Sequence, residues 1–153
     1  MKEKEIKKFF DAYYAEFVKE LDKKDIELIR RIQSHGLQKG VVINPWATDD
    51  ESIGAIEDAM KIVPGLPRDL IVYRVGKMKI KDRPYLSATY SKDIAVEQIA
   101  DGDKSKLHKI VLRKGCKIIP LRILNEDGYD GEKEIIINQS KLKYRLTHYE
   151  YVE

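Results

Sequence analysis

The apolar residues of this chain change their spacing near residue 66, and that change restricts the folds it can adopt. Before it, apolar side chains recur every three or four residues, the period of a helix that buries one face. After it, short runs of period two predict strands. Helices followed by strands predict an α+β fold in which helices pack on mostly antiparallel strands. We expect a single domain, 1–153, with a helical part at 1–65 and a strand-rich core at 66–153.

Local signals divide the two parts into elements. In the helical part, the apolar spacing and the start and stop signals predict three helices. The first runs over 6–21, the second runs from 26 and stops at 34–36, and the third starts at 48–50 and stops at 64–65. Strands are expected at 69–76, 85–91, 109–115, 117–124, 132–138 and 143–152, with one short helix within 91–100.

Composition argues against a disordered or a fibrous protein. With 42% hydrophobic and 36% charged residues, the chain is typical of globular proteins, and its net charge of +3 permits an anionic or nucleic acid partner without favouring either. The single cysteine, Cys116, excludes an internal disulfide and should be buried. No apolar run reaches membrane-spanning length and no signal peptide is evident, so we expect no membrane partner. The expected location is cytoplasmic, in the producing cell or in a host cell after delivery.

An arginine stands on a strand face that is otherwise apolar or bare. In the stretch 69–76, alternation puts Leu70, Val72, Arg74 and Gly76 on one face. The structural explanation is an arginine whose stem packs while its head reaches water. The functional one is an anion site, because a guanidinium binds phosphate through paired hydrogen bonds and a glycine lets a ligand approach the backbone.

The stretch 85–91 carries a row of hydroxyls at Ser87, Thr89 and Ser91. Such a row is common on an edge strand wetted by water, where Ser91 would turn outward and cap the following helix. Hydroxyls both donate and accept hydrogen bonds, so they could also hold a carboxylate in one rotamer.

Two glutamates, Glu132 and Glu134, stand two positions apart before an apolar run, and on a strand they would share one side. The structural explanation is a solvated strand end, with Lys133 between the carboxylates. Cleavage of a sugar bond also needs two carboxylates, one to stabilise the positive sugar ring and one to orient or deprotonate the nucleophile. An anion clamp, hydroxyls and paired carboxylates together suit the splitting of a phosphate-bearing glycoside.

In this order, VYRVG at 72–76, YLSATYS at 85–91 and YDGEKEIII at 129–137 resemble three motifs of the mono-ADP-ribosyltransferases. These are the arginine, serine-threonine-serine and glutamate-x-glutamate motifs of members found in bacterial binary toxins and in phages. The resemblance runs from about Leu66 to the C-terminus. It implies an ADP-ribosyltransferase-like fold whose strand-rich half binds NAD and transfers ADP-ribose to an acceptor with release of nicotinamide.

The resemblance also implies roles for single residues. Arg74 would contact NAD through its phosphates, and the backbone of Val75 and Gly76 would hold the nicotinamide amide. Glu134 would be the catalytic glutamate, bonding the 2′-hydroxyl of the nicotinamide ribose and favouring the oxocarbenium ion. Glu132 would face the acceptor, and a glutamate there resembles the members that modify arginine, so a target protein's arginine is the expected acceptor.

Ser87 and Thr89 would be the outer hydroxyls of the serine motif, and Ser87 would hold the catalytic carboxylate. Tyr129 resembles the exposed aromatic of the acceptor-recognition loop, although a turn tyrosine packed on the sheet edge explains it equally well. The chain departs from the family's pattern in three ways: Val75 precedes the glycine, Ala88 stands mid-motif, and only Tyr90 and Lys92 follow where toxin members often supply an aromatic and a second arginine to NAD.

Other functions stay open. The acceptor could be a nucleic acid base, a small guanidine, or water, which would make the protein an NAD glycohydrolase. A non-catalytic binding module could instead use the basic runs at 77–83 and 112–117, with Tyr85 stacking on a base, although nucleic acid is not the favoured partner. Intact Arg74, Glu132 and Glu134 favour the enzyme. No metal is implied, because the histidines are scattered without ligand spacing.

Overall fold

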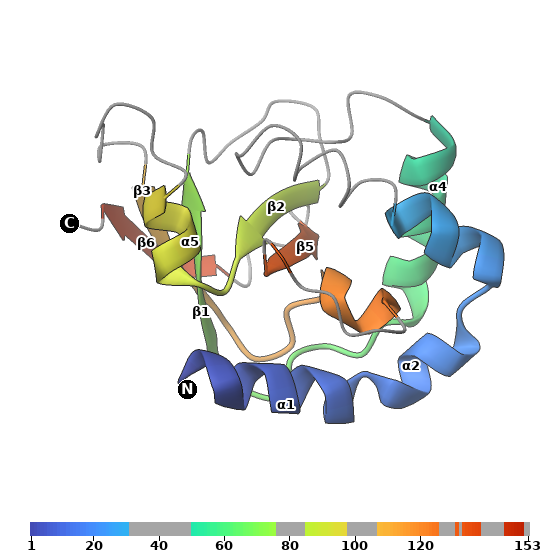
Figure 1. The fold of residues 1–153 in the computed structure, drawn as a ribbon, viewed down its shortest axis with the longest axis horizontal. Coiled ribbons are helices and arrows are strands. Elements are labelled where there is room, and N and C mark those ends of the chain that lie inside the picture. Colours follow the sequence, from blue (N-terminus) through green and yellow to red (C-terminus); the bar gives the residue numbers. More distant parts are fainter. Residues whose placement is uncertain are drawn as a thin grey trace.

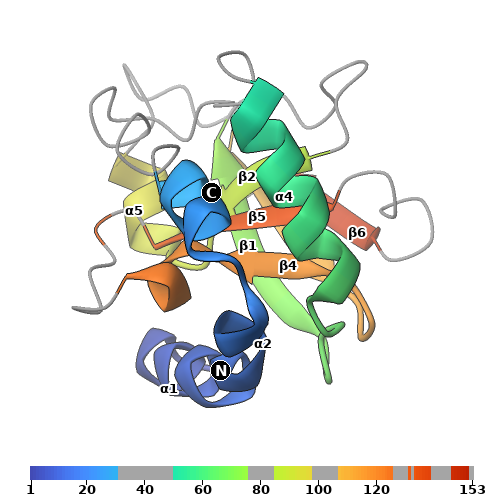
Figure 2. The ribbon, with the colours of Figure 1, turned by 90° about the vertical axis from the view of Figure 1, so that its right-hand side faces the viewer.

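The computed structural model describes residues 1–30, 50–75, 85–97, 107–125, 131, 133–138 and 146–151. Figure 1 shows the first two helices running along the lower side of a sheet. In Figure 2, turned by 90°, the helix α4 crosses in front of the strands. The helices are α1 (Glu3–Tyr13), α2 (Ala15–Glu20), α4 (Asp50–Ile62) and α5 (Lys92–Glu97), with a further helical segment at 23–30.

The predicted long first helix is divided into α1 and α2 at Tyr14. This residue leaves helical geometry, with φ −97° and ψ 5°. Its ring is fully buried and packs against Phe10 and Phe17 on either side of the break, with ring centroids 6.0 and 6.2 Å apart. The apolar stripe is therefore continuous although the helix is not. Neither glycine nor proline marks the position, so the local sequence held no signal for the break.

The sheet has six strands in the order β4-β5-β2-β1-β3-β6, and every described pairing is antiparallel. The strand β2 lies between β5 and β1, so the explanation of the hydroxyl row as a wetted edge strand is wrong. The strands are β1 (Leu70–Val75), β2 (Tyr85–Thr89), β3 (Leu107–Leu112), β4 (Ile118–Pro120), β5 (Glu134–Asn138) and β6 (Leu146–Tyr151).

Several predicted strands are shorter than expected, among them the one predicted at 85–91, which ends at Thr89, and for three others the reason is local. The strand predicted at 117–124 ends at Pro120, which has no N–H for a ladder, and a 3₁₀ helix follows. The strand predicted at 109–115 ends before a turn in which Gly115 has φ 92°. The strand β5 starts at Glu134 because Lys133 has φ 49°, outside strand geometry. The predicted helix signals at 34–36 and 48–49 lie outside the described residues.

Gly65, three residues after the end of α4, makes a close backbone contact. A Cβ atom at Gly65 would lie 2.8 Å from the carbonyl oxygen of Gly115. Hydrogen bonds flank this crossing: Gly115 N–H donates to Leu66 O (2.7 Å), and Leu66 N–H donates to Cys116 O (2.8 Å). Tyr13 adds a third connection, because its hydroxyl donates to Gly65 O at 2.6 Å. The segment after α4 is therefore fixed both to the sheet side and to α1.

The core lies between the helices and the sheet and draws on both parts of the chain. Cys116 is fully buried with a free thiol, as predicted. Asp11 of α1 accepts two hydrogen bonds from Arg122, at 2.9 and 2.7 Å. Within the ranges described, no helix has the length and apolar character to cross a bilayer. The core includes Ile6, Phe10, Tyr14, Phe17, Ile56, Ala59, Leu86, Ala88, Ile110, Ile135, Ile136 and Ile137. The assignment of 1–153 to one domain stays a prediction.

Candidate active site

Arg74 lies on the buried face of β1 with Leu70 and Val72, and it is only 4% exposed. Its Nη1 donates a hydrogen bond to the carbonyl oxygen of Ser87, 2.5 Å away. Burial lowers the pKa of Arg74 to about 10, while the Glu134 carboxylate acts in the opposite direction. The guanidinium is therefore charged at neutral pH. The structural explanation, in which the Arg74 side chain packs its stem and exposes its guanidinium to water, is wrong.

Glu134 is the first residue of β5 and is 3% exposed, so it is not a solvated strand end. The register of β2 and β5 pairs Glu134 with Thr89 and pairs Ile136 with Ser87. Ser87 and Glu134 are thus diagonal neighbours on one side of the sheet. The Ser87 hydroxyl donates a hydrogen bond to Oε2 of Glu134, which restricts the carboxylate's orientation.

Arg74, Ser87 and Glu134 come from three adjacent strands and form the candidate site. Opposite charges in a buried setting interact more strongly than they do in water. An oriented carboxylate can stabilise positive charge that develops next to it, and a guanidinium can bind an anionic group. The structure brings these three predicted residues together, and their roles in a reaction stay predictions.

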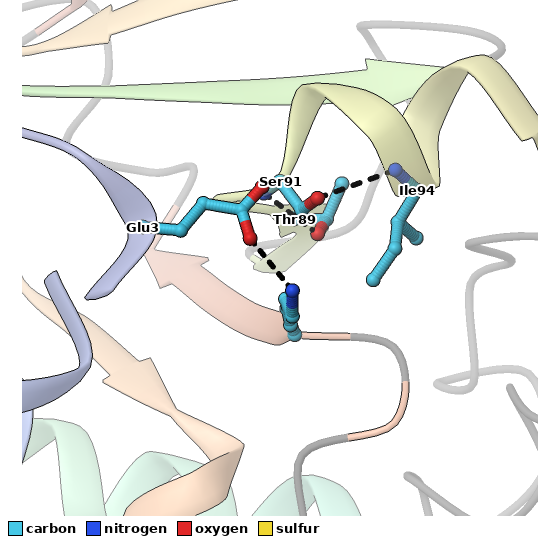
Figure 3. A network of polar contacts seen from close by, with 5 residues as sticks. Glu3, Thr89, Ser91 and Ile94 are labelled. Carbon is cyan, nitrogen blue, oxygen red and sulfur yellow. Dashed lines mark hydrogen bonds and ion pairs between the residues drawn. The ribbon is translucent and has the colours of Figure 1, made fainter.

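The remaining hydroxyls of the row shape the start of α5. Thr89 Oγ1 accepts a hydrogen bond from the Ser91 N–H at 3.1 Å, and Ser91 Oγ accepts one from the Ile94 N–H at 3.3 Å (Figure 3). Ser91 therefore caps α5, as predicted, but it is buried rather than turned outward. The predicted contact of Thr89 with NAD is untested by this geometry.

Tyr90, a predicted NAD contact, follows β2 and is mostly used in packing. Its ring meets Phe10 edge-on at 5.4 Å, and the residue is 2% exposed. It also lines, with Lys92 and Tyr73, an open pocket of about 480 Å³ whose lining contains none of the three site residues. A role for Tyr90 in binding NAD stays a prediction. In the described part of the chain, no three His, Cys, Asp or Glu side chains gather as metal ligands.

Gly76, Tyr129, Glu132 and the side chain of Val75 lie outside the described residues, so their predicted roles stay predictions. One premise about the glutamates does not hold. Side chains two apart share a side only when the residue between them is extended, and Lys133 has φ 49°. The shared side expected for the two carboxylates therefore does not follow from strand alternation.

Sequence reasoning missed the partner of Lys133. Its Nζ lies 2.6 Å from Oε2 of Glu3, at the start of α1. Glu3 is one of several charged residues in MKEKEIKK, and nothing local distinguishes it from the others. The contact joins positions 130 apart in sequence, so only the folded chain reveals it.

The fold is similar to that of Plx2a, an ADP-ribosyltransferase toxin from Paenibacillus larvae, with a TM-score of 0.58. The similarity covers 88% of this chain and 82% of that chain, at 13% sequence identity. At this identity the likeness is one of fold, and it confirms the predicted ADP-ribosyltransferase-like α+β fold. No family model matches the sequence, and neither does any curated protein.

Proposed function

We propose that this chain is an NAD-dependent mono-ADP-ribosyltransferase whose acceptor is a protein arginine. The observation that carries the proposal is the hydrogen bond from Ser87 to the buried Glu134, with Arg74 held beside it. These side chains come from β1, β2 and β5, which are neighbours in the sheet and carry the three motifs in their sequence order. The likeness of the fold to an ADP-ribosyltransferase toxin supports the same activity.

In the proposed reaction, the charge of each site residue has a use. The Arg74 guanidinium binds the diphosphate of NAD. The bond between the ribose C1′ and the nicotinamide nitrogen breaks, and its electron pair stays on the nicotinamide, which leaves as a neutral molecule. Positive charge develops on the ribose, and the oriented Glu134 carboxylate stabilises it. Neither a metal nor a redox step takes part in this scheme.

The second half of the reaction forms a bond between C1′ and a nitrogen of the acceptor. An arginine guanidinium is protonated in water, so a carboxylate must orient it and take a proton as the bond forms. Glu132 is our candidate for that base, on the strength of the motif alone. A protein arginine fits this requirement, whereas water as acceptor would give an NAD glycohydrolase.

The rival function, a nucleic-acid-binding module, receives less support from the structure. Tyr85, the aromatic proposed to stack on a base, is 5% exposed and lies in the core. In the basic run 112–117, Arg113 pairs with Asp69 at 2.8 Å, and Lys117 donates to a carbonyl of α4 at 3.0 Å. These cations serve contacts within the chain. The run at 77–83 lies outside the described residues.

The proposal is tested by incubating the protein with a cell lysate and NAD that carries label in its ADP-ribose part. We expect nicotinamide release and label on protein, neither of which should occur with Glu134→Ala. Label that nuclease removes and protease does not would move the acceptor to nucleic acid. A folded wild-type protein that releases no nicotinamide would end the enzyme proposal.

A second variant tests the division of labour between the two carboxylates. Glu132→Ala should abolish transfer to the acceptor and leave appreciable hydrolysis of NAD, because Glu134 alone supports departure of nicotinamide. The ratio of labelled protein to released nicotinamide measures this partition. An equal loss of both would contradict separate roles.

A further inference from the structure

The residue that precedes Glu134 has an unusual backbone conformation. Lys133 has φ 49°, which places an L side chain in the left-handed region that non-glycine residues rarely adopt. Such a conformation persists only when the surroundings enforce it. Two contacts do so: Lys133 Nζ lies 2.6 Å from Glu3 Oε2, and the Lys133 carbonyl accepts a hydrogen bond from Tyr90 N–H at 3.2 Å.

Glu3 belongs to a network that joins four elements (Figure 3). Its carboxylate receives hydrogen bonds from Lys133 and from the Ser91 side chain. Burial alone would raise the pKa of Glu3, but these two hydrogen bonds lower it below its ordinary value of 4.5. Ser91 in turn bonds to Thr89, at the end of β2, and caps α5 through Ile94. The start of α1 thus meets the end of β2, the start of α5 and the start of β5.

We propose that Glu3 and Lys133 are positioning residues: the first helix holds Lys133 in the backbone conformation that directs the Glu134 side chain toward Ser87. This inference rests on the proposed function, in which Glu134 stabilises the ribosyl cation. The N-terminal helix is then a support of the catalytic strand as well as part of the core. A displacement of about 1 Å at a reacting group lowers a rate by up to about 100-fold, so the support has kinetic consequences.

The matched pair Glu3→Gln and Asp11→Asn separates positioning from stability. Both residues lie on α1 and both lose an ion pair, but Asp11 pairs with Arg122 through two bonds that lie outside this network. Glu3→Gln should lower kcat for nicotinamide release by about 3- to 10-fold with KM for NAD nearly unchanged, and Asp11→Asn should leave kcat within about twofold. Equal kcat values for the two folded variants would overturn the proposal.

The backbone conformation is tested by Lys133→Gly beside Lys133→Val. Both changes remove the ammonium group, but glycine adopts φ 49° without strain whereas a β-branched residue resists it. We expect Lys133→Val to reduce kcat about 10-fold more than Lys133→Gly does. If the valine variant is as active as the glycine variant, the conformation of this residue does not position Glu134.

A third measurement does not depend on activity. The Tyr90 amide donates to the Lys133 carbonyl, so its hydrogen exchange, followed by NMR, reports whether Lys133 is held in place. Exchange should be at least about 5-fold faster in Glu3→Gln than in Asp11→Asn. Equal exchange rates would overturn the positioning role even if the wild type cleaves NAD. A wild type that cleaves no NAD would instead end the proposed function, whatever the exchange rates are.

Discussion

Ser87→Ala removes one hydroxyl and tests whether Ser87 orients the carboxylate of Glu134, the proposed catalytic residue. The hydroxyl donates to a carboxylate, and both residues are almost completely buried, Ser87 at 1% and Glu134 at 3% exposure. A hydrogen bond to a charged group contributes about 1.5–3 kcal/mol. If the bond keeps Glu134 in place more strongly in the transition state than in the bound ground state, by this full amount, its loss lowers kcat by about 10- to 150-fold, since about 1.4 kcal/mol corresponds to a factor of ten.

The assay is the initial rate of nicotinamide release at saturating NAD, with each variant confirmed to be folded by circular dichroism. Ser52→Ala is the matched control, because Ser52 is also buried and its hydroxyl donates to the Leu28 carbonyl at 3.3 Å. That bond is neutral, so its loss should lower the free energy of unfolding by about 1 kcal/mol and leave kcat within about twofold.

Two results would refute the reasoning. A folded Ser87→Ala protein with kcat close to that of the wild type would show that the hydroxyl does not orient Glu134 during the reaction. An equal loss of kcat in Ser87→Ala and Ser52→Ala, measured per folded molecule, would show that any buried hydroxyl matters and that the site geometry is not special.

Three further predictions concern stability, measured by urea unfolding. Tyr13→Phe should lower the free energy of unfolding by about 1 kcal/mol, because it loses a hydrogen bond. Tyr14→Phe removes a buried hydroxyl that has no hydrogen-bond partner in the described part of the chain, so it should be neutral or stabilising by about 1 kcal/mol. Equal losses of stability in the two variants would contradict this. Gly65→Ala should destabilise the fold by about 2 kcal/mol or more, because the added Cβ overlaps the backbone of Gly115. Gly54→Ala, in the middle of α4 with open space around it, should stabilise the fold by about 0.5–1 kcal/mol. A Gly65→Ala protein as stable as the wild type would show that the two backbone segments can move apart. The pKa of Glu3 lies below 4.5, so its ionised form stabilises the fold fully above pH 4.5. The difference in the free energy of unfolding between wild type and Glu3→Gln should therefore be constant at neutral pH and shrink as the pH falls below 4.5. A difference that grows on acidification would contradict this sign.

Much of the fold and part of the site could be predicted from local patterns. Alternation within a short strand determines which residues share a face, and it correctly put Arg74 on the face of β1 that is buried. The same reasoning placed Ser87 and Glu134 on strands of a sheet. The ADP-ribosyltransferase-like fold followed from the order of these motifs rather than from any one of them.

Strand order and long-range contacts could not be predicted in this way. Nothing within 85–91 shows that β2 lies between β5 and β1, because pairing depends on residues far away in sequence. The ion pair between Glu3 and Lys133 is of the same kind. The end of β4 is different, because it could have been predicted: Pro120 is a local signal for the end of a strand, and the prediction of a strand over 117–124 did not take it into account. The left-handed conformation of Lys133 had no such signal and is maintained by tertiary contacts.

The most direct test of the central claim is the rate of nicotinamide release from NAD by the purified protein and by Glu134→Gln. The amide is nearly the same size as the carboxylate and still accepts a hydrogen bond from Ser87, so the variant removes the charge and little else. The wild type should cleave NAD, and the variant should be slower by about 100- to 1000-fold, the usual loss when one electrostatic stabiliser is removed from an active site. A folded wild type that releases no nicotinamide, or a Glu134→Gln protein as fast as the wild type, would contradict the proposed function.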